Sequence, residues 1–163
     1  MSRWAARRER ALALRFPPSE PCACDACRQY CLRPGWWTVE EAKDAVAAAY
    51  GNRMMLEVAP ERTFGVLAPA FKGCEGSFAL QQFADRGCTF LQGGRCELHG
   101  TGLQPLECRF CHHDRPGSGP QCHAALESDW HSPAGRTLIA RWSRMVGLRA
   151  ELQRLGLSRI AGW

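Results

Sequence analysis

The sequence contains no long apolar run. None of its stretches reaches the roughly 18 apolar residues that a membrane-spanning helix requires, so we expect no contact with a membrane. The first residues carry the arginines of a secretion signal. The apolar stretch that follows covers only residues 11–14, whereas such a signal needs roughly seven to fifteen apolar residues. We therefore predict a cytoplasmic protein.

Motifs of the common enzyme classes are absent as well. The chain contains no G-x-G-x-x-G, no Walker phosphate loop, no G-x-S-x-G and no H-E-x-x-H. These motifs indicate dinucleotide binding, nucleotide binding, serine hydrolysis and zinc proteolysis. No catalytic residue is therefore assigned, and an enzyme that depends on an iron–sulfur cluster is kept as one alternative function.

Lysine is scarce: the chain has only Lys43 and Lys72, compared with 19 arginines. Its formal net charge is +5. A basic protein suggests an acidic partner such as nucleic acid, and the Trp36–Trp37 pair is a candidate for stacking on bases. However, four thiolates around zinc or a [4Fe–4S] cluster leave about two negative charges, so two such sites would offset most of the arginine excess. Nucleic acid is therefore the disfavoured partner, and we expect the tryptophan pair to pack in the interior.

Cysteine, by contrast, is abundant, with ten residues in a chain of 163. A cytoplasmic protein keeps its thiols reduced, so this density indicates metal binding. In an exported chain the same ten cysteines would instead form disulfide bridges, which is the alternative interpretation. Metal ions are thus the expected ligands, and no protein partner is predicted.

The spacing of the cysteines is typical of metal ligands. The two groups are Cys22-x-Cys24-x2-Cys27-x3-Cys31 and Cys88-x7-Cys96-x11-Cys108-x2-Cys111-x10-Cys122, with Cys74 between them. A Cys-x2-Cys turn places two sulfurs on one side of the backbone, and both zinc and iron–sulfur clusters take four thiolates. The spacing does not choose between two four-coordinate sites and one polynuclear cluster. The predicted cofactor is zinc or an iron–sulfur cluster.

Histidines near the cysteines offer two further interpretations. Residues 108–112 match the C-x-x-C-H of covalent haem attachment, but haem would leave the other eight cysteines unexplained. One of the four histidines near cysteines could replace a sulfur as a ligand, but each by itself is interpreted as a surface residue or as a neighbour of ligands. They are His99, His112, His113 and His123.

The second cysteine group resembles the YkgJ-type cysteine-cluster family, also described as the zinc- or iron-chelating CxxCxxCC domain. Cys88-Thr-Phe-Leu matches the C-x-F-L of this family, and Cys96-Glu-Leu-His stands where C-x-I-Y belongs. Pro105-x-x-Cys108-Arg matches P-x-x-C-R, and Cys122 is the late cysteine. The resemblance covers about residues 22–131.

The chain also departs from this family pattern. The adjacent Cys-Cys pair is missing, His99 replaces the tyrosine, and Gln104 replaces the arginine before the proline. The resemblance implies metal or iron–sulfur binding and no defined reaction. The predicted ligands are eight cysteines: Cys22, Cys24, Cys27, Cys31, Cys88, Cys96, Cys108 and Cys122.

The predicted fold is one small α+β or irregular, metal-stabilised domain over residues 1–163. In it, cysteine-rich loops pack with a few helices and a short hairpin. Residues 1–16 form a basic N-terminal helix or arm, residues 22–131 the metal-binding part and residues 132–156 a C-terminal amphipathic helix capped by Ser132.

Three shorter elements are predicted between these parts. Thr38-Val-Glu-Glu41 fits a capping box that starts a helix over residues 38–50. Residues 54–58 and 63–67 form the two strands of the hairpin, and residues 77–85 form a short helix.

Overall fold

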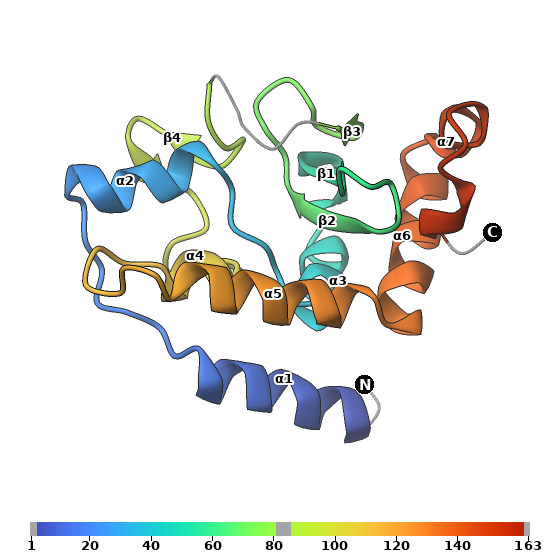
Figure 1. Cartoon of the computed structure of the whole chain (residues 1–163). Coiled ribbons are helices and arrows are strands. Elements are labelled where there is room, and N and C mark those ends of the chain that lie inside the picture. The colour runs from blue at the N-terminus through green and yellow to red at the C-terminus, as the bar shows by residue number, and fades with distance from the viewer. Residues whose placement is uncertain (1–2, 81–85, 162–163) are drawn as a thin grey trace.

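The computed structural model describes residues 3–80 and 86–161 of the chain, which form a mixed α+β structure (Figure 1). The helices are α1 (Arg3–Arg15), α2 (Asp25–Leu32), α3 (Val39–Ala47), α4 (Leu106–Phe110), α5 (Gly119–Trp130), α6 (Pro133–Met145) and α7 (Arg149–Arg154). The strands are β1 (Met54–Val58), β2 (Gly65–Pro69), β3 (Phe78–Ala79), β4 (Leu91–Gln92) and β5 (Arg95–Cys96). Two short 3-10 helices cover Gly51–Arg53 and Ser158–Ala161.

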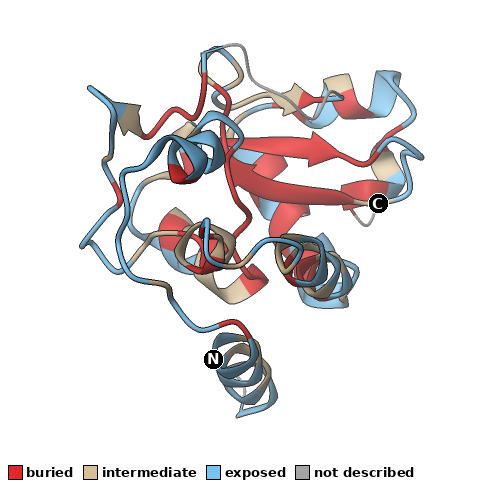
Figure 2. Ribbon diagram, turned by 60° about the vertical axis from the view of Figure 1, so that its left-hand side comes forward, coloured by how far each residue is buried: buried red, intermediate tan, exposed pale blue. Residues whose placement is uncertain are grey.

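The main sheet has the strand order β2-β1-β3. β1 and β2 are antiparallel, whereas β3 lies parallel to β1. Every residue of β1 and β2 is buried, so the hairpin runs through the interior (Figure 2). The predicted hairpin is confirmed. Its second strand begins two residues later than expected, at Gly65, because the turn is longer and passes through Arg62 at a φ of 57°.

Three fully buried tryptophans organise the core around this sheet. Each indole N–H donates to a backbone carbonyl: Trp37 to Leu103 at 2.7 Å, Trp130 to Trp37 at 2.8 Å and Trp142 to Gly51 at 2.7 Å. A buried indole that satisfies its N–H combines a large apolar contact area with a fixed orientation. Trp36 is also buried, so the prediction that the tryptophan pair packs in the interior is confirmed.

Helix α3 begins with the predicted capping box. The hydroxyl of Thr38 accepts from the Glu41 N–H, and the Glu41 carboxylate accepts from the Thr38 N–H, both at 3.1 Å. The same carboxylate accepts from the Leu106 N–H at 3.0 Å and pairs with Arg109 at 2.7 Å. The cap of α3 therefore also fixes α4, the short helix that carries Cys108.

The C-terminal helix differs from its prediction. Ser132 caps α6 as expected, its hydroxyl accepting from the Gly135 N–H at 3.2 Å. A continuous helix over residues 132–156 is wrong, because the chain breaks between α6 and α7 at Gly147, which adopts a φ of 74°. A positive φ is a conformation that glycine adopts readily and that ends a helix.

The predicted helix over residues 77–85 is also corrected. Phe78–Ala79 forms the strand β3, since it pairs with Leu56 and Glu57 of β1. Residues 81–85 lie outside the described residues. The helices α2 and α5 were not predicted. Helix α2 is short, with one buried residue, and α5 begins within a segment rich in Gly, Pro and Cys, so neither shows a clear apolar periodicity.

The cysteine-rich elements lie on one side of the molecule. Figure 1 shows α2, β4 and α4 beside the main sheet, with α6 and α7 on the opposite side. Helix α2 itself contributes little to the apolar core, since Cys27 is its one buried residue. None of the helices in the described ranges is long and apolar enough to cross a membrane.

The buried Asp129 of α5 provides a test of how the helices are joined. Its carboxylate accepts from the Val39 N–H at 2.8 Å and pairs with Arg8 of α1 at 3.1 Å. Asp129→Ala should lower the free energy of unfolding by about 1–3 kcal/mol, because a buried N–H loses its acceptor. Asp129→Asn keeps an acceptor and loses only a partly exposed ion pair, so its cost should stay below about 1 kcal/mol. Urea unfolding of both variants measures the difference, and equal costs would contradict this account.

Candidate metal centre

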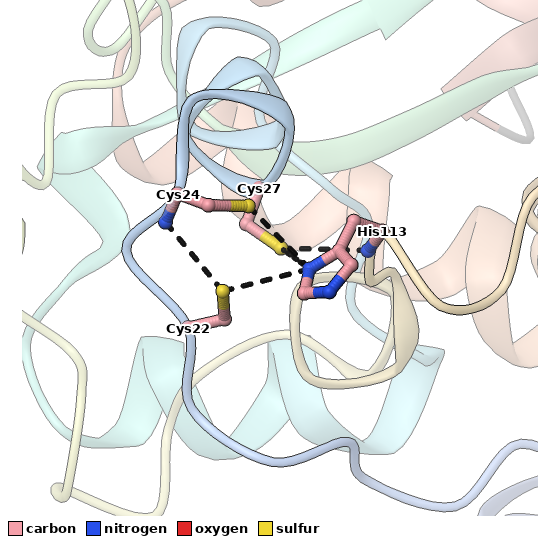
Figure 3. Close-up of side chains that lie close together, drawn as sticks. All are labelled: Cys22, Cys24, Cys27 and His113. Carbon is pink, nitrogen blue, oxygen red and sulfur yellow. Dashed lines mark hydrogen bonds between the residues drawn. The ribbon is translucent and has the colours of Figure 1, made fainter.

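Three cysteines gather where the chain enters α2. Cys22 lies in the preceding loop, Cys24 is the residue before the helix, and Cys27 lies in its first turn (Figure 3). The predicted cysteine-rich loop is therefore partly helical, since Cys27 and Cys31 lie in α2. Cys31 lies one turn further along α2 and does not join the other three.

The fourth position beside these sulfurs is taken by His113. Its Nδ1 atom lies 3.5 Å from the Cys22 sulfur, 3.4 Å from Cys24 and 3.3 Å from Cys27. The four ligand atoms all lie within 4.8 Å of one another. We call Cys22, Cys24, Cys27 and His113 the first centre. It combines three of the predicted ligands with a histidine that the sequence alone had suggested to be a neighbour of ligands.

The second nitrogen of His113 has a carboxylate partner. Nε2 lies 3.0 Å from an oxygen of Asp114. A histidine that binds a metal through one ring nitrogen usually donates its other N–H to a carboxylate or carbonyl. This contact orients the ring with Nδ1 toward the three sulfurs, which is the arrangement a metal ligand needs.

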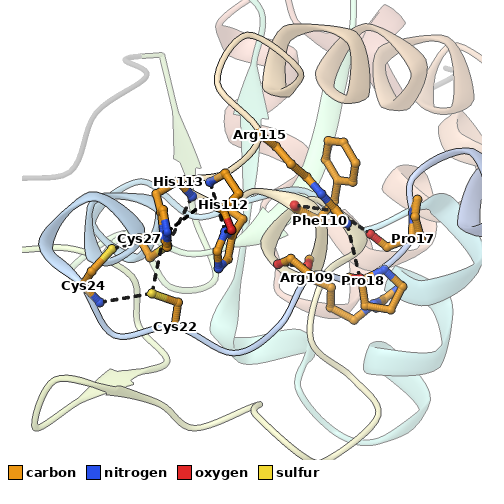
Figure 4. Close-up of polar contacts among 12 residues, drawn as sticks. Pro17, Pro18, Cys22, Cys24, Cys27, Arg109, Phe110, His112, His113 and Arg115 are labelled. Carbon is orange, nitrogen blue, oxygen red and sulfur yellow. Dashed lines mark hydrogen bonds and ion pairs between the residues drawn. The ribbon is translucent and has the colours of Figure 1, made fainter.

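A set of hydrogen bonds joins the two segments that supply the first centre (Figure 4). The Arg115 guanidinium donates to the carbonyls of Pro17 at 2.7 Å and Phe110 at 3.0 Å. The backbone N–H of Ser19 donates to the Arg109 carbonyl at 2.8 Å. These hydrogen bonds therefore hold the loop before Cys22 against the segment that carries His113.

The thiols of the first centre differ in acidity. The pKa of Cys24 is lowered to about 7, chiefly by a hydrogen bond from the backbone of Cys27 and then by one from the Cys22 thiol. The pKa of Cys27 is raised to about 11, chiefly by burial. Cys24 is therefore the first of these two thiols to become a thiolate, the form that binds a metal.

A further set of thiols lies around the C-terminal end of α2. Cys31, Cys88, Cys96 and Cys108 interact with one another electrostatically. We call these four residues the second thiol group. No three of their sulfurs come within 4.8 Å of one another in the described structure, so this group is wider than the first centre.

The other three cysteines belong to neither set. Cys122 is buried in α5, where Glu107 and Cys111 are its main electrostatic neighbours. Among the described residues, Cys122 belongs to no group of three potential ligand atoms that lie within 4.8 Å of one another. Cys74 lies beside Glu75, and Cys111 ends α4.

Sequence reasoning named His113 as one of four histidines that could replace a sulfur, but it did not select His113 as a ligand. The available signal is its position two residues after Cys111, in a segment already rich in potential ligands. That signal does not distinguish His113 from its neighbour His112, which is buried and accepts from the Asp114 N–H at 3.1 Å.

Comparison with known proteins gives no match, since no protein-family model, no curated protein and no solved structure corresponds to this chain. The candidate function therefore follows from the site itself. The donor set of the first centre fits a thiophilic metal ion, because three cysteine sulfurs and one histidine nitrogen form a Cys₃His set.

The acidity of Cys24 predicts its reactivity in the reduced, metal-free protein. Iodoacetamide should modify Cys24 at pH 7 faster than Cys74, whose pKa is raised by burial and by the Glu75 charge. The Cys24 rate should rise as the pH passes through about 7, because the thiolate fraction increases there. Peptide mass spectrometry measures both rates. Equal rates at the two cysteines would contradict the proposed acidity.

Proposed function

We propose that this chain is a metal-binding protein whose first centre holds one zinc ion. The observation that supports this most directly is the position of His113 Nδ1, 3.3 to 3.5 Å from three cysteine sulfurs. Zinc bonds to sulfur at about 2.3 Å and to histidine nitrogen at about 2.0–2.1 Å, so a tetrahedral site has sulfur–nitrogen edges of about 3.6 Å. The separations in the structure are close to this value.

The compact form of the first centre favours zinc over an iron–sulfur cluster. A polynuclear cluster places several iron atoms and sulfides between its ligands, so its thiolates lie farther apart than those around one ion. Histidine together with three thiolates is also a common zinc ligand set. The ligand positions and the donor types therefore support the same occupant.

The metal has a structural role in this proposal. It joins the start of α2 to the segment of His113, and both segments have many exposed residues. A segment with little buried apolar surface needs another source of stability, and metal–ligand bonds supply it. The resemblance to the YkgJ-type family supports the same chemistry. Zinc binding also requires reduced thiols, which supports a cytoplasmic location.

Substitution of His113 tests the first centre. His113→Gln should weaken Zn²⁺ and Co²⁺ binding at this centre by at least tenfold, because one of four ligands is lost. His113→Cys should restore binding with a four-sulfur Co²⁺ spectrum, since a thiolate can replace the imidazole. Competition titration with a chromophoric chelator measures affinity, and visible absorption of the Co²⁺ form reports the ligands.

The matched control for this experiment is His99→Gln, which alters an exposed histidine outside the first centre. It should leave Co²⁺ affinity and the Co²⁺ spectrum unchanged. The proposal is wrong if His113→Gln behaves like this control.

Metal removal should loosen only part of the fold. After chelation, backbone amides of residues 22–32 and 108–118 should exchange with deuterium much faster, because these segments lose the bonds that join them. The buried strands β1 and β2 and helix α6 should keep their protection, since their stability comes from the tryptophan core. Hydrogen exchange with mass spectrometry resolves the two regions. Uniform protection after chelation would exclude the structural role of the metal.

A further inference from the structure

The second thiol group begins with a backbone contact between Cys31 and Cys88. The Cys88 N–H donates to the Cys31 carbonyl at 3.2 Å, near the C-terminal end of α2. The residue before it, Gly87, adopts a φ of 82°, and a Cβ atom there would lie 3.5 Å from the same carbonyl. A positive φ favours glycine, so Gly87 lets the chain pass close to α2 and brings two cysteines from distant parts of the sequence together.

The β4–β5 hairpin adds Cys96 to this pair. Cys96 pairs with Leu91 across the hairpin, and the Glu97 N–H donates to the Phe90 carbonyl at 2.8 Å. The Phe90 N–H in turn donates to the Cys88 sulfur at 3.4 Å. Cys88 and Cys96 are therefore both located at the open end of one short hairpin, which fixes their relative positions.

Cys108 reaches the group from α4, next to Gly35. The Gly35 backbone hydrogen-bonds to the Cys108 thiol. A Cβ atom at Gly35 would lie 2.7 Å from the Cys108 sulfur. The absence of a side chain at this position therefore leaves the space that the sulfur occupies.

Each thiol of the group is within electrostatic range of at least two others. Cys88 interacts with Cys31, Cys96 and Cys108, and Cys96 also interacts with Cys31 and Cys108. Four thiols gathered from α2, the β4–β5 hairpin and α4 provide the number and type of donors that a thiophilic metal takes.

We propose that Cys31, Cys88, Cys96 and Cys108 form a second metal centre, with four thiolate ligands and no histidine. Its occupant is a thiophilic metal, either an iron–sulfur cluster or a zinc ion, since both take four cysteine sulfurs. The site extends the proposed metal-binding function, but it shares no ligand with the first centre. An experiment can therefore disprove one centre without disproving the other.

Helix α2 joins the two centres. Cys27 belongs to the first centre and Cys31 to the second, and residues four apart on a helix lie on the same face. The helix has eight residues and little apolar burial of its own. Ligands at both of its ends would hold it against the hairpin and against the segment that carries His113.

The metal content of single variants tests the second centre. Zinc, iron and acid-labile sulfide are measured per chain on full-length protein purified without oxygen. Cys96→Ser should remove the occupant of the second centre and keep the zinc of the first, because serine is a poor ligand for either metal. His113→Gln should do the reverse. Cys74→Ser, which alters a cysteine outside both sets, should keep both occupants.

The possible results for Cys96→Ser separate the occupants and the two centres. Loss of iron together with sulfide supports the second centre and identifies a cluster, whereas loss of one of two zinc ions supports it and identifies zinc. Unchanged metal and sulfide contents in Cys96→Ser would overturn the proposal of a second centre. This result would not affect the proposal of the first centre. An unchanged zinc content in His113→Gln would count against the first centre alone.

X-ray absorption of the wild-type protein keeps the proposal testable if Cys96→Ser does not fold. An iron–sulfur cluster in the second centre should show sulfur ligands only, separate from the zinc of the first centre. Two zinc ions should show on average more than three sulfurs per zinc, because the first centre supplies three and the second supplies four. A single zinc with three sulfurs and no iron would overturn the second centre.

Discussion

The proposed metal centre depends on how the negative charge of closely placed thiolates is neutralised. Three cysteine sulfurs of the first centre lie within 4.8 Å of one another and of an imidazole nitrogen. Like charges at such distances disfavour ionisation. Burial raises the pKa of Cys27, whereas a backbone hydrogen bond lowers the pKa of Cys24. A bound cation removes this conflict, because it stabilises all the thiolates at once. The electrostatics of the first centre therefore favour a metal ion as much as its ligand types do.

The rest of the molecule is built on a different source of stability. The strands β1 and β2 are buried along their whole length, and three fully buried tryptophans donate to backbone carbonyls around them. Apolar burial and these hydrogen bonds stabilise this core. The Glu41 carboxylate connects the two parts, since it caps α3 and also holds α4. The cysteine-rich side is thus anchored to an apolar core at one edge and, in our proposal, completed by metal–ligand bonds at the other.

The two proposed centres differ in how far their cysteines are exposed. Cys22 and Cys24 are exposed and Cys27 is buried, whereas Cys88 is buried and the other three cysteines of the second centre are half-buried. Metal exchange should therefore be easier at the first centre, where solvent and competing ligands reach the sulfurs. Helix α2 carries ligands for both proposed centres and would gain its order from them. The arginine excess of the chain is consistent with this picture, because two thiolate centres offset much of the positive charge.

Local patterns were sufficient for several elements. Thr38 and Glu41 indicate the start of α3 because a capping box uses only neighbouring residues, and the hairpin strands follow from short apolar runs on either side of a turn. The break at Gly147 and the strand β3 were not predicted. A glycine is tolerated within a helix as well as at its end, and a two-residue strand is defined by its partner.

The sequence by itself determined that this protein concentrates potential metal ligands, because cysteine density and spacing are properties of the chain alone. It also determined the hairpin and the start of α3. Only the tertiary structure decided which ligands share a site. It placed His113 beside Cys22, Cys24 and Cys27, and it placed Cys31 beside Cys88. The physical reason is that residues as distant in the chain as Cys27 and His113 meet only through packing and long-range backbone hydrogen bonds, which no local spacing records.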